Sequence, residues 1–483
     1  MEERTRENHQ SHEKTPKQRG IPTVSRALDD GTLVELLYDA RERKTSLAIW
    51  DGNIWNVEQS YALDLSHLLV PYSPENNLIK HQVILFPEKA EEYGTTQELV
   101  NHIQTFIHRY VDLSPVFEII ATYYILLSCV YDKFNELPYL RVRGDYGSGK
   151  TRFLLVVGSL CYKGAFASGA SSVSPLFHIL DSFRGTLIMD ESDFRFSDEK
   201  AEIVKILNNG NVKGFPVLRC EVNRYKEFNP RAFNVYGPKV LATRGHYDDK
   251  ALESRFLTED MGQGPLRKDI PISLPNSWEE EARSIRNKLL LYRFRHYGKA
   301  AIRSTAMDPS LEPRMNQIYR PLLALVDDTE ARHMLLNYAH TKHQEIVLDR
   351  SMEMEAQVLS MILKLSRASQ SPGVSIKQIA DRLYQEHGLD YDRAITPKWI
   401  GTIVRQKLHL RTYKRHGAFV VSVNEKTLEP LYEKYGIRDD EDARFLSRGA
   451  PDDSLPLPIG GLGDLGTLGE GRWPRDSIET KAP

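Results

Sequence analysis

Residues 139–151 read Tyr-Leu-Arg-Val-Arg-Gly-Asp-Tyr-Gly-Ser-Gly-Lys-Thr, and the rest of the chain is organised around them. The first five form a short β-like run, the pattern Gly-x-x-x-x-Gly-Lys-Thr follows, and apolar residues at 153–157 begin a helix. A strand, a glycine-rich loop and a helix in this order are the context in which a P-loop motif has meaning. The stretch therefore predicts a phosphate-binding site.

Each residue type in this loop has a chemical reason. Glycines let consecutive backbone N–H groups curl around phosphate oxygens, and the helix N-terminus behind them favours negative charge. Lys150 is expected to reach the β- and γ-phosphates of a nucleoside triphosphate, and the Thr151 hydroxyl to ligate Mg²⁺. A chance glycine-rich turn is the alternative explanation. The predicted nucleotide-contacting residues are Gly144, Gly147, Ser148, Gly149, Lys150 and Thr151.

The composition is that of an ordinary globular protein. Its 483 residues leave room for roughly three domains, and 41% hydrophobic and 27% charged residues are usual values. Cys129, Cys161 and Cys220 show neither disulfide nor metal-ligand spacing. The polar N-terminus lacks the apolar segment of a signal peptide, and the longest apolar run, residues 119–131, is too short to cross a bilayer. We therefore expect a cytoplasmic protein.

A second predicted strand ends in two carboxylates. Residues 185–191 read Gly-Thr-Leu-Ile-Met-Asp-Glu, downstream of the P-loop. In a P-loop ATPase the first carboxylate, here Asp190, holds the Mg²⁺ shell, and the second, here Glu191, polarises the attacking water. A buried strand whose acidic end only begins a turn is the alternative. Together with the P-loop, the pair predicts ATP hydrolysis with Mg²⁺.

The segments that follow come in an informative order. Residues 215–219 and 231–236 are predicted strands around a polar tip, residues 238–244 form a buried strand with a polar end, and Ser-Arg-Phe stands at 254–256. This order resembles the ATPase core of AAA+ proteins over about residues 115–330. The inserted hairpin resembles the superfamily 3 and MCM-type helicases of phages and mobile elements.

The resemblance assigns expected roles to two further residues. Thr243 takes the sensor-1 place, where the family often has Asn, and Arg255 takes that of the arginine finger, which the family supplies across a subunit interface. Such a finger stabilises charge on the transferred phosphoryl group. A salt bridge to Glu253 or Asp260 is the alternative use of Arg255. The resemblance also implies a hexameric homo-oligomer acting on DNA, with a primase or other replication proteins as partners.

The hairpin tip combines cations with an aromatic residue. Arg224, Tyr225 and Lys226 suit a nucleic-acid strand through phosphate contact and base stacking. In the helicase clade this tip projects into a central pore and moves with the ATP cycle. A solvated hairpin end is the alternative, because Glu227 dilutes the positive charge.

Residues 351–424 predict a winged-helix domain. Three expected helices precede two strands at 410–414 and 418–423, and residues 356–424 hold 11 Lys+Arg against 4 Asp+Glu. Domains of the helix-turn-helix class place their recognition helix in the major groove, although such a fold can also serve protein contacts. The predicted DNA contacts are Lys398, Arg405, Lys407, Arg411, Lys414 and Arg415.

The expected fold class is α/β, with an AAA+ P-loop core, a helical lid, a small β-rich N-terminal domain and a C-terminal winged helix. Arg283, Arg286, Arg314 and Arg320 are candidates for a sensor-2 arginine in the lid, which the resemblance implies. The expected boundaries are 1–20 disordered, 21–94 β-rich domain, 95–270 ATPase core, 271–350 lid, 351–424 winged helix and 425–483 acidic, Gly/Pro-rich tail.

The favoured interpretation is an ATP-dependent DNA helicase or translocase that takes part in replication of a mobile element or phage. Two other functions fit the same motifs. A replication initiator or loader would use ATP as an assembly switch without translocation. An ATP-gated DNA-binding regulator would act without forming a ring.

Overall fold

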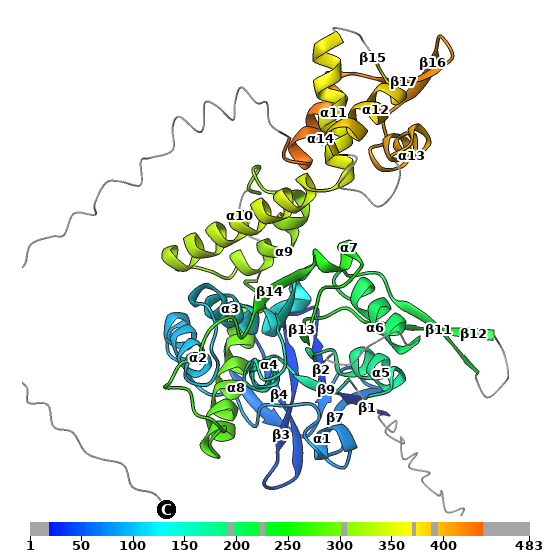
Figure 1. Ribbon diagram of the computed structural model, residues 1–483. Helices are drawn as coiled ribbons and strands as arrows, with labels where there is room; N and C mark the ends of the chain where they lie inside the picture. The colour runs from blue at the N-terminus through cyan, green and yellow to red at the C-terminus, as the bar shows by residue number, and fades with distance from the viewer. Residues whose placement is uncertain are drawn as a thin grey trace, which may run out of the picture. The chain divides into compact units, whose positions relative to one another are not determined.

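The computed structural model describes two compact units, which meet in sequence between Ile346 and Val347. Unit 1 contains the P-loop and unit 2 contains the basic C-terminal segment. Figure 1 labels their helices and strands. Each unit is described by itself. The described residues are 19–169, 171–190, 198–222, 228–300, 307–369, 373–387 and 395–437.

Five parallel strands form the centre of unit 1 in the order β14-β8-β13-β10-β9. The chain leaves β8 for the β9 edge, returns through β10 and β13, and then crosses to the other side of β8 with β14. Ligands of open parallel sheets bind at such a reversal, outside the carboxyl ends of the strands. The strands are β8 (Tyr139–Arg143), β9 (Ala165–Ala167), β10 (Leu187–Asp190), β13 (Lys239–Thr243) and β14 (Phe256–Asp260).

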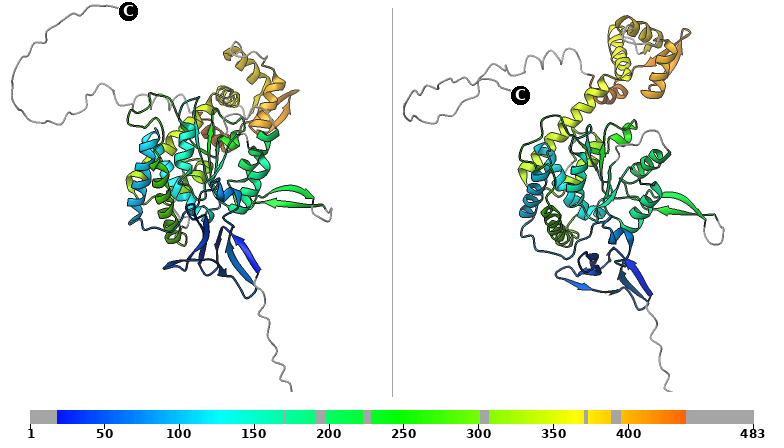
Figure 2. Two further views of the ribbon diagram at one scale, coloured as in Figure 1. Left: turned by 90° about the horizontal axis from the view of Figure 1, so that it is seen from below. Right: turned by 60° about the horizontal axis from the view of Figure 1, so that its bottom comes forward.

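Helices cover both faces of this sheet, because side chains of each strand alternate between the faces. Leu140, Val142 and Ile188 pack with α2 (Thr96–Tyr110), α3 (Pro115–Val130), α4 (Lys150–Gly158) and α8 (Ser277–His296). Tyr139, Leu187 and Met189 pack on the other face with α5 (Val173–Phe183) and α6 (Asp198–Asn209). The result is a three-layer α/β arrangement (Figures 1 and 2).

Helix α3 is the central helix of the larger core. Ser114 caps its N-terminus and Pro115 occupies its first turn, as expected for a helix start. The apolar run at 119–131 was expected to be too short to cross a bilayer, but the helical segment around it, Pro115–Lys133, is long and apolar enough, alone within the described part of the chain. Of its most apolar window, 78% is buried inside the protein. That burial is typical of a core helix.

The N-terminal strands form two small antiparallel or mixed sheets, β2-β3-β4-β5 and β1-β7-β6. They belong to unit 1, and Glu35 of β3 forms a buried ion pair with Arg293 of α8 at 2.7 Å. Gly52, at φ 106°, lies in the turn between β4 and β5. The elements are β1 (Arg19–Thr23), β2 (Ser25–Ala27), β3 (Leu33–Asp39), β4 (Lys44–Trp50), β5 (Trp55–Glu58), β6 (Tyr61–Ala62), β7 (His67–Pro71) and α1 (Asn77–Lys80).

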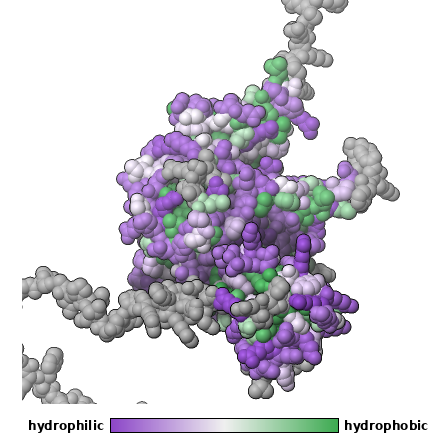
Figure 3. Space-filling view, turned by 90° about the horizontal axis from the view of Figure 1, so that it is seen from above, coloured by the Kyte–Doolittle hydropathy of each residue, from purple (hydrophilic) through white to green (hydrophobic). Residues whose placement is uncertain are grey.

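The predicted hairpin is present as β11 (Val217–Val222) and β12 (Phe228–Phe233), which pair antiparallel in a sheet of their own. It projects away from the rest of unit 1 in every ribbon view (Figures 1 and 2). Apolar side chains lie exposed along this arm (Figure 3), among them Phe215 and Leu218. The predicted tip residues Arg224, Tyr225 and Lys226 lie outside the described residues.

Unit 1 also contains η1 (Tyr131–Lys133), α7 (Lys250–Glu253) and α9 (Pro313–Leu323), and α10 (Thr329–Ser351) crosses into unit 2. Helices α8 and α9 hold the four arginines that were expected in the lid. Leu335 and Ala339 of α10 belong to the main core of unit 1.

Unit 2 has a separate core of helices against a three-stranded antiparallel sheet, β15-β17-β16. Ser375 ends β15 and directly precedes α12, the position of a helix N-cap, and its N–H donates to Gln378 Oε1 at 3.3 Å, as in one half of a capping box. The third helix continues as a π-helical turn, η2, which the sequence did not indicate. The elements are α11 (Met354–Ser369), β15 (Gly373–Ser375), α12 (Ile376–His387), α13 (Pro397–Thr402), η2 (Ile403–Lys407), β16 (Thr412–Arg415), β17 (Ala418–Ser422) and α14 (Glu425–Lys434).

Candidate functional site

The glycine-rich loop joins β8 to α4 at the carboxyl edge of the central sheet. Gly147 and Gly149 have φ values of 75° and 92°, which glycine adopts without the steric cost that a Cβ would bring. A Cβ on Gly144 would lie 2.6 Å from the carbonyl oxygen of Met261. No side chain caps α4, so its first backbone N–H groups remain available to an anion.

Lys150 is held inside this loop. Its side chain is largely buried, and Nζ donates to the carbonyl oxygens of Gly144 and Asp145, both at 2.6 Å. Burial lowers the pKa of Lys150, while the carboxylate of Asp190 acts in the opposite direction. The ammonium group therefore lies where phosphate oxygens could replace the two carbonyl oxygens as its acceptors.

Thr151 and Asp190 meet beside the loop. The Thr151 hydroxyl donates to Asp190 Oδ2 at 3.3 Å, and Asp190 Oδ1 is buried without a hydrogen-bond partner among the described residues. A hydroxyl and an unpartnered carboxylate oxygen fit Mg²⁺, which uses few protein ligands and completes its shell with water and phosphate oxygens. Glu191, the predicted water-activating residue, lies outside the described residues.

An open pocket extends from the loop. Its apolar wall includes Val111 and Leu113, from the connection between α2 and α3, and Met261 and Leu266, which follow β14. Arg152 of α4 fixes the far side of this wall, because it donates to the carbonyl oxygens of Pro271, at 2.5 Å, and Ile272. The pocket thus combines a polar phosphate loop with an apolar surface, as small-molecule sites commonly do.

Thr243 lies at the end of β13, directly beside Arg143 of the P-loop strand. Its hydroxyl donates to the carbonyl oxygen of Gly245 at 3.0 Å, and the next residue, Arg244, lines the pocket. The Arg244 guanidinium lies 3.9 Å from the ring centroid of Tyr146 in the P-loop. The sequence interpretation missed Arg244, although a cation at the polar end of a buried strand was a usable signal.

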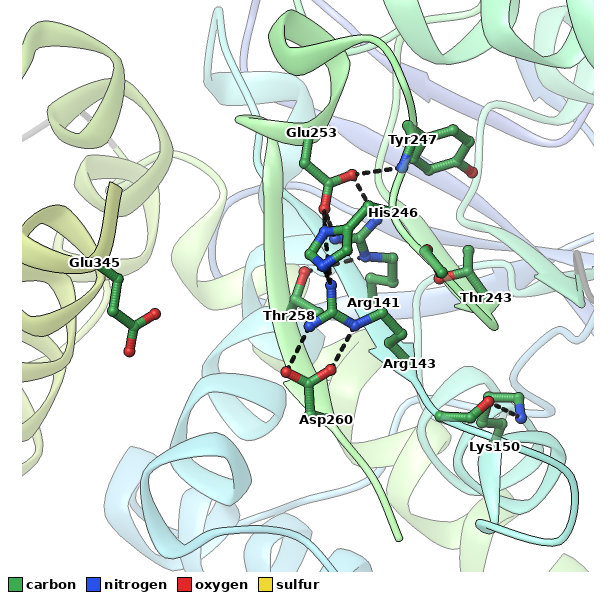
Figure 4. A network of polar contacts seen from close by, with 12 residues as sticks. Arg141, Arg143, Lys150, Thr243, His246, Tyr247, Glu253, Thr258, Asp260 and Glu345 are labelled. Carbon is green, nitrogen blue, oxygen red and sulfur yellow. Dashed lines mark hydrogen bonds and ion pairs between the residues drawn. The ribbon is translucent and has the colours of Figure 1, made fainter. Parts of the chain in front are cut away.

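A polar network lies beside the loop and links β8 to the segment after Thr243 (Figure 4). Arg143 donates to both carboxylate oxygens of Asp260, at 2.5 and 2.6 Å. The His246 ring lies between Arg143 and Glu253, with Nδ1 2.8 Å from a Glu253 oxygen. Its members come from β8, β14, α7 and the loop after β13, so the network ties together the elements that surround the pocket.

Arg141 forms the buried half of this network (Figure 4). It is 1% exposed, and its guanidinium donates to both oxygens of Glu253 and to Thr258 Oγ1, the last at 3.1 Å. Burial opposes ionisation of Glu253, but the ion pair and hydrogen bonds outweigh it and lower the pKa of Glu253 to about 2. The sequence interpretation treated Arg141 and Arg143 only as strand residues.

Arg255 lies at the opposite end of the sheet from the P-loop. It precedes β14, and its carbonyl accepts from the N–H of Tyr139, the first residue of β8. Its guanidinium donates to Asn208 Oδ1, and burial together with nearby Arg314 lowers the pKa of Arg255. Glu253 and Asp260, the alternative partners considered from the sequence, instead bind Arg141 and Arg143.

The candidate sensor-2 arginines do not line the described pocket, and none of its lining residues belongs to α8, α9 or α10. Arg283 forms an ion pair with Glu88 at 3.3 Å, and Arg286 donates to the Ser159 carbonyl at 2.9 Å. Arg314 lies near Arg255, with its Nε 3.4 Å from Ser254 Oγ. Arg320 Nε is buried without a hydrogen-bond partner among the described residues. In this structure the helices expected as a lid therefore do not cover the loop.

The predicted DNA-contacting cations of unit 2 are all exposed. Residues 395–423 contain six Lys and Arg residues and no Asp or Glu. Lys407 Nζ lies 4.0 Å from Glu355 Oε1, and a surface ion pair at this distance contributes little to stability. The structure also brings an exposed aromatic residue, Phe419, close to two of these cations, which the sequence interpretation did not include. The six are Lys398 on α13, Arg405 and Lys407 on η2, Arg411 before β16, and Lys414 and Arg415 on β16.

No protein-family model matches this chain, and neither does any curated protein sequence. The apo C-terminal region of NrS-1 is 12% identical, covering 81% of this chain and 96% of that one, with a TM-score of 0.36. The active helicase Cch of SCCmec type IV is 9% identical, covering 86% and 80%, with a TM-score of 0.36. The Orc1 protein of Aeropyrum pernix, solved with DNA, is 13% identical, covering 73% and 98%, with a TM-score of 0.20. Identities of 9–13% and TM-scores of 0.20–0.36 assign this chain to no family.

Proposed function

We propose that this chain is an ATP- and Mg²⁺-dependent ATPase that acts on DNA. The observation that carries the proposal is the contact of Thr151 with Asp190 beside the P-loop, which leaves Asp190 Oδ1 without a partner among the described residues. Thr151 and Asp190 would hold a divalent metal here, and the metal would neutralise charge that develops on the phosphates. The first N–H groups of α4 and the Lys150 ammonium would hold the same phosphates.

The remaining residues of the site have separate roles in this proposal. Glu191 polarises the attacking water, Thr243 takes the sensor-1 role, and Arg244, which lines the pocket, faces the phosphates. The apolar wall around Met261 holds the base. Arg255 serves the nucleotide of a neighbouring copy, since it lies at the far end of its own sheet. The active form is therefore a homo-oligomer, for which we propose a hexameric ring of the AAA+ type.

The DNA-acting part of the proposal is a helicase or translocase in replication of a phage or mobile element. Its support is the projecting β11–β12 hairpin, whose tip sequence is basic and aromatic, and the basic surface of unit 2, which we interpret as a winged helix. A replication initiator or loader that uses ATP as a switch is the second candidate. The same basic unit 2 supports it, because a domain of the helix-turn-helix class binds duplex DNA without any need for translocation.

ATP hydrolysis with and without single-stranded DNA separates these functions. We expect DNA to stimulate the wild type, Glu191→Gln to abolish turnover, and Lys226→Ala to remove only the stimulation. Lys205→Ala is the matched control, because Lys205 is an exposed lysine of α6 that pairs with Glu202. If DNA changes nothing while Glu191→Gln still abolishes turnover, the switch function replaces the motor. If wild-type turnover is absent, the ATPase proposal itself is wrong.

A further inference from the structure

Phe419 is an exposed aromatic residue in the most basic part of unit 2. It lies on β17, two residues before Val421, which is fully buried in the unit 2 core. Alternation along a strand puts both side chains on the same face of the sheet. Phe419 therefore lies on the side of β17 that faces the core, but beyond the edge of the core, and it is 48% exposed. A single exposed apolar residue has no meaning by itself, so its surroundings decide what it can do.

Two cations from different elements surround the ring. Lys414 is the cross-strand partner of Phe419, and its Nζ lies 5.4 Å from the ring centroid. Arg405 comes from η2, and its guanidinium carbon lies 5.8 Å from the same centroid. Both distances are within the range of cation–π attraction. Both cations are exposed, and no acidic residue occurs between 395 and 423.

An exposed aromatic ring between two cations favours some classes of ligand over others. An apolar protein partner would desolvate the two cations without compensating them. An acidic peptide would use the cations and leave the aromatic face exposed. A nucleotide offers a flat base for the ring and phosphates for the cations, and base stacking on an aromatic is worth about 1–3 kcal/mol. The chemistry around Phe419 therefore matches a nucleotide best.

We propose that Phe419 stacks on one unpaired DNA base while Arg405 and Lys414 hold the adjoining phosphates. Bases inside a continuous duplex are not accessible to such a ring, so the site requires a base that is already unpaired. Unit 2 then recognises gaps or junctions, where duplex gives way to single strand. This inference rests on the proposed function only in taking DNA as the partner.

The test compares DNA binding by the full chain to a closed circular duplex and to the same circle with a single-stranded gap. A fluorescent base analogue in the gap reports stacking. We expect Phe419→Ala to weaken binding to the gapped circle by about 5- to 150-fold, the equivalent of 1–3 kcal/mol. It leaves affinity for the closed circle and DNA-independent ATP hydrolysis unchanged. Phe419→Trp keeps the gap preference, and Lys414→Ala weakens binding to both circles.

Tyr384→Ala is the matched control, because Tyr384 is an aromatic residue of α12 that is 62% exposed. The proposed stacking site is wrong if Phe419→Ala weakens binding to both circles equally or to neither. It is also wrong if Tyr384→Ala weakens binding to the gapped circle as much as Phe419→Ala does. Failure of Phe419→Trp to keep the gap preference has the same meaning. If the wild type binds neither circle, the DNA-acting function falls as well. If DNA stimulates wild-type ATP hydrolysis but the wild type binds the two circles with equal affinity, only the stacking site is wrong.

Discussion

The variant Glu253→Gln removes one negative charge from the network beside the P-loop. The Glu253 carboxylate accepts from both terminal nitrogens of Arg141 and from the N–H of Tyr247, the latter at 3.0 Å. Arg141 is 1% exposed, so water cannot replace the lost carboxylate. The variant would therefore leave a cation buried without its counter-charge.

The size of the effect follows from the pKa of Glu253. Burial raises that pKa, but the contacts with Arg141 outweigh burial and lower it from 4.5 to about 2. The shift corresponds to about 3 kcal/mol. Breaking a buried ion pair by removing one partner costs about 3–5 kcal/mol. We expect Glu253→Gln to lower the free energy of unfolding by about 3 kcal/mol. Because the folded pKa is lowered, this contribution is present above pH 4.5 and is lost as pH falls toward 2.

Urea unfolding followed by tryptophan fluorescence measures this loss, since Trp50, Trp55 and Trp278 all belong to unit 1. Glu92→Gln is the matched control. Glu92 also binds an arginine, Arg295, through both oxygens, and its pKa is likewise lowered to about 2, but the pair is exposed. Solvent screening leaves an exposed pair with little net effect on stability. Equal losses in the two variants would refute the argument that burial of Arg141 sets the cost.

Three further predictions follow from other parts of unit 1. Burial lowers the pKa of Lys239 from 10.5 to about 7, so the unfolded chain holds one more proton between these values. Stability should then rise by about 1.4 kcal/mol per pH unit above pH 7, and urea unfolding of Lys239→Met should lack this slope. Gly149→Ala places a Cβ at φ 92°, at a cost of about 1–2 kcal/mol, and should weaken binding of Mg²⁺-ATP in calorimetry. Arg255→Ala and Lys150→Ala should each abolish ATP turnover. Mixing the two variant proteins should restore part of this turnover.

The P-loop and three of the five central strands, β8, β10 and β13, were predictable because each is a local pattern, whereas β9, β14 and the order of the strands in the sheet were not predicted. Glycine spacing specifies a backbone path, and apolar runs of strand length specify buried strands. Asp190 was identified because its strand ends in carboxylates after a P-loop. The side-chain partners were not predictable in the same way. Arg141 contacts Glu253, 112 positions away, and Arg293 contacts Glu35, 258 positions away. A pattern within one segment does not show which charged residue from a distant segment will contact it in the folded protein.

The same limit explains Arg244 and Phe419. Each looks ordinary in sequence, as a polar residue at a strand end and an apolar residue within a strand. Their significance comes from what the tertiary structure puts beside them, namely Tyr146 for the first and two cations for the second. Conversely, the lid arginines were candidates only because the resemblance implies a sensor-2 arginine. Packing directs Arg283 to Glu88 and Arg286 to the Ser159 carbonyl instead.

Strand register gives the strongest reason to expect a site shared between copies. Phe256 of β14 pairs with Tyr139 of β8, and Asp260 pairs with Arg143, which directly precedes the loop. Arg255 therefore lies about six residues along the strand direction from Gly144, which is about 20 Å at the usual rise per residue. No rotamer of one arginine spans that distance, so Arg255 cannot reach the phosphates held by its own chain. Either it acts on the nucleotide of another copy, or it serves only to bind Asn208. Restored turnover on mixing Arg255→Ala with Lys150→Ala would require the first, because an intact loop and an intact arginine are then present only on different chains.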